Sequence, residues 1–170
     1  MKINVVLGDI TKQDTEAIVN PANKSLLGGG GADGAIHRSA GSELLEECKT
    51  LGGCKTGEAK ITKGYNLKAK FVIHTVGPVY GAEKGNEAEL LRKCYVNSLK
   101  LALEKGIKSI SFPSISTGAF RYPKKEACEI AVNTCMEFGK GLDEIRFVVF
   151  DKESLELYNQ EVVKNQKEAN

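Results

Sequence analysis

Short apolar runs recur along the chain, separated by segments in which apolar residues fall at helical spacing. Several of these runs lack polar alternation, which predicts strands that are covered on both faces, as in a largely parallel sheet. The expected strands are Ile3–Leu7, Ala17–Val19, Ala59–Thr62, Phe71–Val76, Ser109–Phe112 and Ile145–Phe150.

Two intervening segments show the periodicity of amphipathic helices. The first, ending at Lys105-Gly106, places Leu90, Leu91, Cys94, Ser98, Leu101 and Ala102 on one face. The second has Pro123 in its expected first turn and places Ala127, Ile130, Ala131, Thr134, Cys135 and Phe138 together. Alternating strands and helices predict a three-layer α/β/α domain around a central mixed, largely parallel sheet of about six strands. We expect one domain over residues 1–164, followed by a frayed polar tail over 165–170.

Charge and cysteine usage narrow the possible partners. The 24 basic and 22 acidic residues give a net charge of +2 and are interspersed, so nucleic-acid binding has little support. The five cysteines are odd in number and include no C-x-x-C, which predicts free thiols and a cytoplasmic protein. No apolar run approaches the roughly 18 residues of a membrane span, and no N-terminal leader is visible. Neither histidine has a partner at metal-ligand spacing, so we expect no metal or other cofactor.

The strongest candidate site is the polar segment 20–34, which contains four consecutive glycines between a strand and a helix. A glycine run exposes several backbone N–H groups that can converge on an anion at a helix N-terminus. Asp33 is out of place in such a cradle, because a carboxylate would repel a phosphate unless it faced another part of the ligand. We therefore expect Asp33 to take part in chemistry.

Simpler interpretations of the same residues remain open. Asp33 would also suit the N-cap of a helix that begins near Gly34. Asn20 and Asn23 are common turn formers, although their grouping favours a ligand role. His37 lies one helical turn after Asp33, where it would either orient the carboxylate or only pack against its neighbours.

A second strand is followed by the segment Ser114–Phe120, whose hydroxyls and glycine suit phosphate contacts. Both loops leave strand ends and would face each other across one cleft, which is where ligands of open α/β sheets bind. Phe120 would pack either on a ligand ring or back into the core. His74 lies inside an apolar run, and we interpret it as a hydrogen-bonded core histidine.

Two other site classes are disfavoured. Gly29-x-Gly31-x-x-Gly34 matches the glycine pattern of nicotinamide dehydrogenases, but eight residues separate it from the preceding strand. The P-loop pattern is absent, and no nucleophile elbow surrounds Ser116 or Thr117.

The motifs taken together resemble the macro domain family, most closely its MacroD-type class. The resemblance runs from residue 3 to residue 162. It rests on Gly8-Asp9-Ile10-Thr11, Val19-Asn20-Pro21-Ala22-Asn23, residues 28–37, Thr56-Gly57-Glu58-Ala59, Ile73-His74-Thr75-Val76-Gly77-Pro78 and Ser116-Thr117-Gly118-Ala119-Phe120.

This resemblance implies a site for ADP-ribose. Asp9 would bind the adenine amino group, with the Ile10 backbone and Phe150 beside the base. Asn23 and Phe120 would hold the distal ribose, next to Asp33. The further residues expected at the ligand are Asn20, Gly30, Gly31, His37, Ser116, Thr117, Gly118 and Ala119.

The resemblance also implies an activity, since family members that cleave their ligand carry the acidic residue found here as Asp33. We expect a hydrolase in which Asn23 and Asp33 act on an ester of the distal ribose, in O-acetyl-ADP-ribose or in a Glu- or Asp-linked ADP-ribosylated protein. The alternatives are a non-catalytic ADP-ribose reader and a phosphatase for ADP-ribose-1″-phosphate. We expect a monomer that meets nucleic acid only as an ADP-ribosylated substrate. Arg121 and Ala119 depart from the family pattern, which bears on substrate choice.

Overall fold

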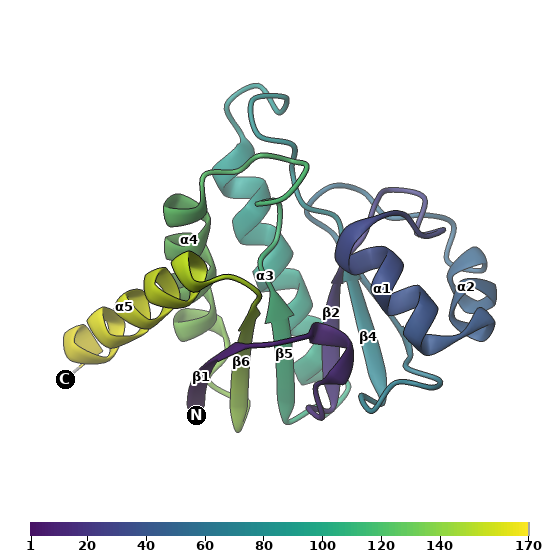
Figure 1. Ribbon diagram of the computed structural model, residues 1–170, viewed down its shortest axis with the longest axis horizontal. Helices are drawn as coiled ribbons and strands as arrows, with labels where there is room; N and C mark the ends of the chain where they lie inside the picture. Colours follow the sequence, from purple (N-terminus) through teal and green to yellow (C-terminus); the bar gives the residue numbers. More distant parts are fainter. Residues whose placement is uncertain (170) are drawn as a thin grey trace.

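The computed structural model describes residues 1–169 and contains one six-stranded sheet (Figure 1). The strand order is β1-β6-β5-β2-β4-β3, and all neighbouring strands are parallel except β3, which pairs antiparallel with β4. The strands are β1 Lys2–Leu7, β2 Ala17–Pro21, β3 Ala59–Lys63, β4 Phe71–Thr75, β5 Ser109–Pro113 and β6 Glu144–Val149. The predicted mixed, largely parallel sheet is confirmed.

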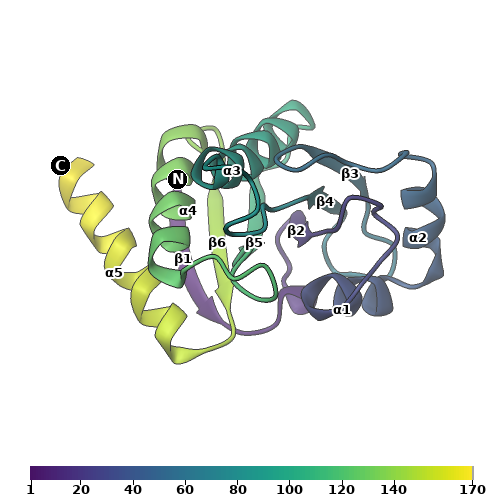
Figure 2. The same cartoon turned by 90° about the horizontal axis from the view of Figure 1, so that it is seen from above.

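Helices cover both faces of the sheet, which gives the predicted three layers (Figure 2). One face carries α3 (Glu87–Glu104), α4 (Lys124–Phe138) and α5 (Lys152–Ala169). The other carries α1 (Gly31–Ala40) and α2 (Ser42–Lys49), beside a short 3-10 helix, η1 (Ile10–Lys12).

The larger core lies beneath α3, α4 and α5 and is organised around aromatic rings. Phe112 on β5 lies 5.1 Å from Tyr95 and 6.2 Å from Phe147, measured between ring centroids. Tyr158 on α5 continues the row at 5.2 Å from Phe147. Edge and offset contacts of this kind stabilise aromatic pairs beyond the area they bury, so the row joins α3 and α5 to the middle of the sheet.

The smaller core lies beneath α1 and α2, where Ile36 and Leu44 pack over the apolar face of β2 and β4. The two helices meet at Gly41, whose φ of +90° is unfavourable for any residue with a Cβ. A Cβ there would also lie 2.8 Å from the Nδ2 atom of Asn66. This corner turns α2 along the sheet and leaves α1 pointing its N-terminus at the strand ends.

Three local predictions were wrong. Helix α1 begins at Gly31 rather than near Gly34, and Pro123 is the N-cap of α4 rather than part of its first turn. Residues 165–169 continue α5 instead of forming a frayed tail, and Asn165 donates from Nδ2 to the Glu161 carbonyl at 2.8 Å within the helix. Asn170 lies outside the described residues.

Two further expectations concerned thiols and membranes. All five cysteines are free, as predicted, and all five are buried. Within residues 1–169, every helix is too short or too polar to cross a bilayer.

Candidate functional site

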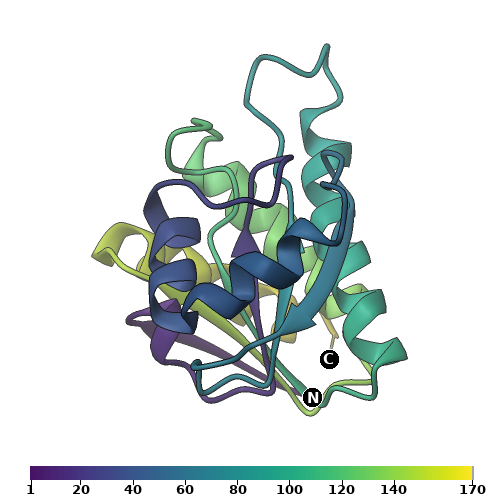
Figure 3. The ribbon, with the colours of Figure 1, turned by 90° about the vertical axis from the view of Figure 1, so that its right-hand side faces the viewer.

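The carboxyl ends of the five parallel strands meet along one edge of the sheet. In the order β1, β6, β5, β2, β4 they are followed by Asp9, Phe150, the 114–122 loop, the 22–30 loop and the 77–86 loop. The loops after β2, β4 and β5 extend from the same end of the sheet (Figure 3). The two predicted site loops therefore leave strand ends, as expected, and their strands β5 and β2 are neighbours in the sheet.

The 22–30 loop folds tightly over the start of α1. A Cβ at Gly34 would collide with the carbonyl oxygen of Gly29, so this glycine permits the close contact of loop and helix. A Cβ at Gly29 would lie 3.1 Å from Asp33 Oδ2 and 3.2 Å from Asn23 Nδ2. The loop thus brings Asn23 and Asp33 to either side of one small residue.

Asp33 is in the first turn of α1, where a negative charge is favoured by the helix dipole. Gly30 occupies the N-cap position, so the N-cap interpretation of Asp33 was wrong. The carboxylate is 5% exposed and accepts a hydrogen bond from Asn20 Nδ2 to Oδ1 at 2.8 Å. His37 Nε2 lies 3.5 Å from the same oxygen.

Beneath Asp33, Asn20 and His74 are fully buried. Asn20 Nδ2 lies 3.0 Å from His74 Nδ1, and His74 Nε2 lies 2.9 Å from Thr62 Oγ1. Burial, and secondarily the nearby His37, lowers the pKa of His74 to about 3. The prediction of a hydrogen-bonded core histidine is confirmed. Asn20 was expected among the ligand contacts, but its side chain is covered by Asp33 and faces the core.

Two other predicted site residues, Gly30 and Gly31, lie at the open end of the 22–30 loop. Gly30 and Gly31 are exposed, and a Cβ at either would meet no atom within 4 Å, so their backbones are accessible. Gly31 has a φ of +56° and starts α1. His37 faces back toward the loop, because a Cβ at Gly28 would lie 3.9 Å from its ring.

The 114–122 loop is held in a strained conformation. Ser116 has a φ of +66°, which is uncommon for a residue with a side chain and concentrates at functional sites. Tyr122 N donates to the Ser116 carbonyl at 2.8 Å, and Arg121 N donates to the Gly118 carbonyl at 3.0 Å. These bonds turn the loop back on itself and leave Gly118 and Ala119 exposed at its tip, with Thr117 half-buried.

The same loop is anchored to the segment that follows β4. A Cβ at Gly77 would collide with the Ser116 side chain, so the Gly77 backbone lies directly against that side chain. Tyr80 N donates to the Phe120 carbonyl at 2.9 Å. Phe120 is half-buried, so it is not fully packed into the core.

At the β1 end of the same sheet edge, Asp9 follows β1 and Phe150 follows the neighbouring strand β6. Asp9 Oδ1 accepts from Thr11 Oγ1 at 2.7 Å and from Thr11 N at 2.9 Å, and these bonds hold the pKa of Asp9 below its usual range. Gly8 N donates to the Val149 carbonyl at 2.8 Å, which joins the two strand ends. Phe150 is 83% exposed, whereas the neighbouring Ile10 is buried.

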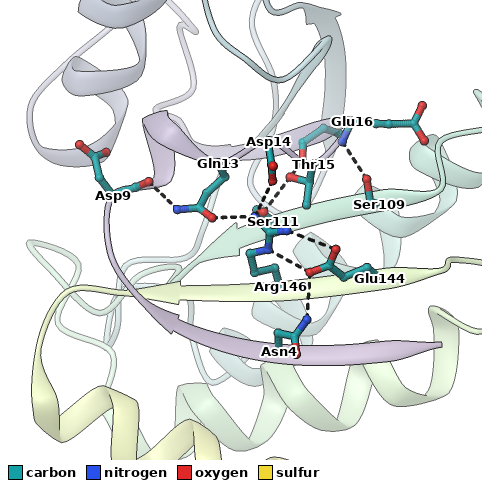
Figure 4. Close-up of polar contacts among 11 residues, drawn as sticks. Asn4, Asp9, Gln13, Asp14, Thr15, Glu16, Ser109, Ser111, Glu144 and Arg146 are labelled. Atoms are coloured by element: carbon teal, nitrogen blue, oxygen red, sulfur yellow. Dashed lines mark hydrogen bonds and ion pairs between the residues drawn. The ribbon is translucent and has the colours of Figure 1, made fainter.

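Arg146 anchors the Asp9 segment to the sheet, a role that the sequence analysis missed (Figure 4). Its Nη1 donates to Gln13 Oε1 at 2.9 Å, and Gln13 Nε2 donates to the Asp9 carbonyl at 2.8 Å. Glu144 binds the same guanidinium through Oε2 at 3.0 Å. An arginine inside an otherwise apolar strand was the available signal.

Comparisons with known proteins agree with this geometry. The family model described as "Macro domain" matches residues 19–131. A macro domain-containing protein of Chlorobaculum tepidum is 55% identical over 159 residues, covering 92% of each chain. A protein of Citrobacter rodentium named O-acetyl-ADP-ribose deacetylase is 53% identical over 164 residues, covering 92% of this chain and 93% of the relative.

Solved structures give the same result. The Oceanobacillus iheyensis macrodomain with ADP superposes with a TM-score of 0.92 at 43% identity, covering 96% of this chain and 91% of that one. The Trypanosoma brucei macrodomain in complex with ADP-ribose gives a TM-score of 0.85 at 46% identity, covering 93% of this chain and 68% of that one. Fold, family model and close relatives coincide, and the chain belongs to the macro domain family.

Proposed function

We propose that the protein binds ADP-ribose and hydrolyses an ester on its distal ribose. The ester is the acetyl group of O-acetyl-ADP-ribose or the link to a Glu or Asp side chain of a modified protein. Support comes from the relative named O-acetyl-ADP-ribose deacetylase and from solved family members that hold ADP or ADP-ribose.

The order of groups along the strand ends suits an extended ligand. Phe150 offers an exposed ring for the adenine, and the second carboxylate oxygen of Asp9 is free of the Thr11 hydrogen bonds, so it accepts from the adenine amino group. The accessible backbones of Gly30 and Gly31 and the 116–119 turn bind the diphosphate, since converging N–H groups favour anions. Asn23 and Phe120 then face the distal ribose.

One observation carries the catalytic part of the proposal, namely that Asp33 and Asn23 flank Gly29 at the start of α1. Asp33 Oδ1 accepts the hydrogen bond from Asn20 Nδ2, and Oδ2 is directed toward Asn23. In our mechanism Oδ2 orients and polarises a water that attacks the ester carbonyl carbon. The bond from that carbon to the ribose oxygen breaks, and the departing ribose oxygen takes up the proton that the water loses and becomes a hydroxyl.

Positioning supplies most of the rate in this mechanism, because a carboxylate is a weak base. The ligand diphosphate, held by the two loops, would hold the attacking water in place. It would also share with Asp33 the proton that this water loses. The reactants of this step are the ester and one water.

A side-by-side assay tests the proposal. Wild-type protein is incubated with O-acetyl-ADP-ribose, a glutamate-linked ADP-ribosyl protein and ADP-ribose-1″-phosphate, while calorimetry follows ADP-ribose binding. We expect binding and release of product from at least one ester, with little phosphate release, because a dianion beside Asp33 is repelled. Binding heat without product from any ester would identify a reader and overturn the hydrolase proposal.

A further inference from the structure

A buried chain of hydrogen bonds runs from the sheet to the Asp33 carboxylate. It joins Thr62 on β3, His74 on β4, Asn20 on β2 and Asp33 on α1. Asn20 and His74 are direct register partners in the β2–β4 pairing, so their contact is set by the sheet itself. Each of the four residues is at most 5% exposed.

We propose that Asn20 and His74 are positioning residues for hydrolysis: His74, neutral and with its proton on Nε2, orients the Asn20 amide, which in turn orients Asp33. Neither residue touches the substrate in this proposal, which rests on the hydrolase function proposed above.

The donors and acceptors allow one direction through the chain. The Thr62 hydroxyl donates to the Lys63 carbonyl at 3.1 Å, so its oxygen accepts from His74 Nε2–H. The Cys48 sulfur lies 3.8 Å from the same nitrogen and is a second, weaker acceptor for this hydrogen. His74 Nδ1 then carries a lone pair and accepts from Asn20 Nδ2. The second hydrogen of that amide nitrogen goes to Asp33 Oδ1.

The reverse orientation of the Asn20 amide is unfavourable. It would point Oδ1 at both the Asp33 carboxylate and the lone pair of His74 Nδ1, removing two hydrogen bonds and adding repulsion between buried groups. Buried polar groups left without partners cost about 1–3 kcal/mol each. His74 therefore determines which way the amide points.

Orientation of Asn20 has a consequence for the reacting end of Asp33. With Oδ1 bound from below, the carboxylate is fixed about its side-chain torsion and Oδ2 is directed at Gly29 and Asn23. Removal of the His74 acceptor should let Asn20 and Asp33 rotate together. The backbone groups proposed to bind the diphosphate take no part in this row of hydrogen bonds. Turnover should therefore fall while ADP-ribose affinity is retained.

Two substitutions of His74 separate positioning from packing. His74→Leu fills the site without an acceptor, and we expect kcat to fall about 10- to 100-fold, the cost of misplacing a reacting group. His74→Asn keeps an acceptor near the Nδ1 position and should recover most of kcat. Both variants should bind ADP-ribose like the wild type, and Asn20→Ala should reproduce the loss seen with His74→Leu.

An unaltered kcat in His74→Leu, or equal losses in His74→Leu and His74→Asn, would overturn the positioning role. If His74→Leu does not fold, Asn20→Ala decides: a wild-type kcat in that variant overturns the proposal. Imidazole nitrogen chemical shifts of the wild type test the chain without any activity. A proton on Nδ1 would contradict it, and a proton on Nε2 supports it. Wild-type inactivity on every ester would instead remove the hydrolase function, and the positioning role with it.

Discussion

Asn23 and Asp33 reach the same small space from two elements, the 22–30 loop and the first turn of α1. Only the missing side chain of Gly29 leaves room between them, since a Cβ there would lie 3.2 Å from Asn23 Nδ2 and 3.1 Å from Asp33 Oδ2. Asn23 is held in place by its bond from Nδ2 to the Gly28 carbonyl at 2.7 Å. The loop thus sets the amide and the carboxylate beside one another before any ligand arrives.

Gly29→Ala should separate binding from turnover. The added methyl group would push apart two polar side chains at distances tighter than ordinary contact. We expect kcat to fall about 10-fold or more, because small displacements of reacting groups are costly. Ester hydrolysis and thermal unfolding measured on the same preparation test this, and a wild-type kcat with a wild-type Tm would contradict the arrangement.

Asp9→Asn should weaken ADP-ribose binding and change base preference. The substitution presents N–H groups where a carboxylate oxygen accepts from the adenine amino group, and hydrogen bonds to charged groups contribute about 1.5–3 kcal/mol. Calorimetry should show weaker ADP-ribose binding and a smaller penalty for the hypoxanthine analogue. Asp143→Asn, an exposed acid at the opposite end of β6, is the matched control. Equal affinities in the Asp9 variant and the wild type would place the base elsewhere.

Phe150→Ala should lower affinity without lowering stability. The ring is 83% exposed, so its removal leaves the core intact. Base stacking on an aromatic ring contributes about 1–3 kcal/mol, or roughly 5- to 150-fold in Kd. The control is Val163→Ala on α5, a residue that is 49% exposed and far from the strand ends in sequence. Similar Kd values for both variants would rule out a stacking role.

His74 should make stability depend on pH. Its folded pKa is about 3, against 6.5 for an exposed histidine, so the unfolded chain binds the proton first as pH falls. Stability should therefore decline from pH 6.5 toward pH 3, by about 2 kcal/mol between pH 7 and pH 5. Urea unfolding at the two pH values measures this, and His74→Asn should lose that part of the slope. An equal slope in the variant would contradict a neutral buried histidine.

Much of the fold could be predicted because its signals are local. Apolar runs located all six strands to within about two residues, and the glycine segment located the turn before α1. The antiparallel placement of β3, the short α2 and η1 were not predicted, since pairing depends on contacts between distant segments. Helix α5 was not predicted either, and its polar last turn, through residue 169, was taken for a tail.

The candidate site, too, could be predicted only where its signals are local in the sequence. Asp33 was singled out from its position among glycines, but its partner Asn20 is 13 residues away in sequence and His74 is 54 residues from Asn20. Those bonds follow from the strand order, which the sequence pattern does not encode. Arg146, which holds the Asp9 segment through Gln13, was likewise found only in the folded structure.

The most direct test of the account is single-turnover ester hydrolysis by Asp33→Ala, with ADP-ribose affinity measured on the same protein. We expect a rate lower by about 100-fold or more, typical of a lost acid-base or water-orienting group, and a Kd close to that of the wild type. A wild-type rate in this variant would remove Asp33 from the mechanism and contradict the central claim.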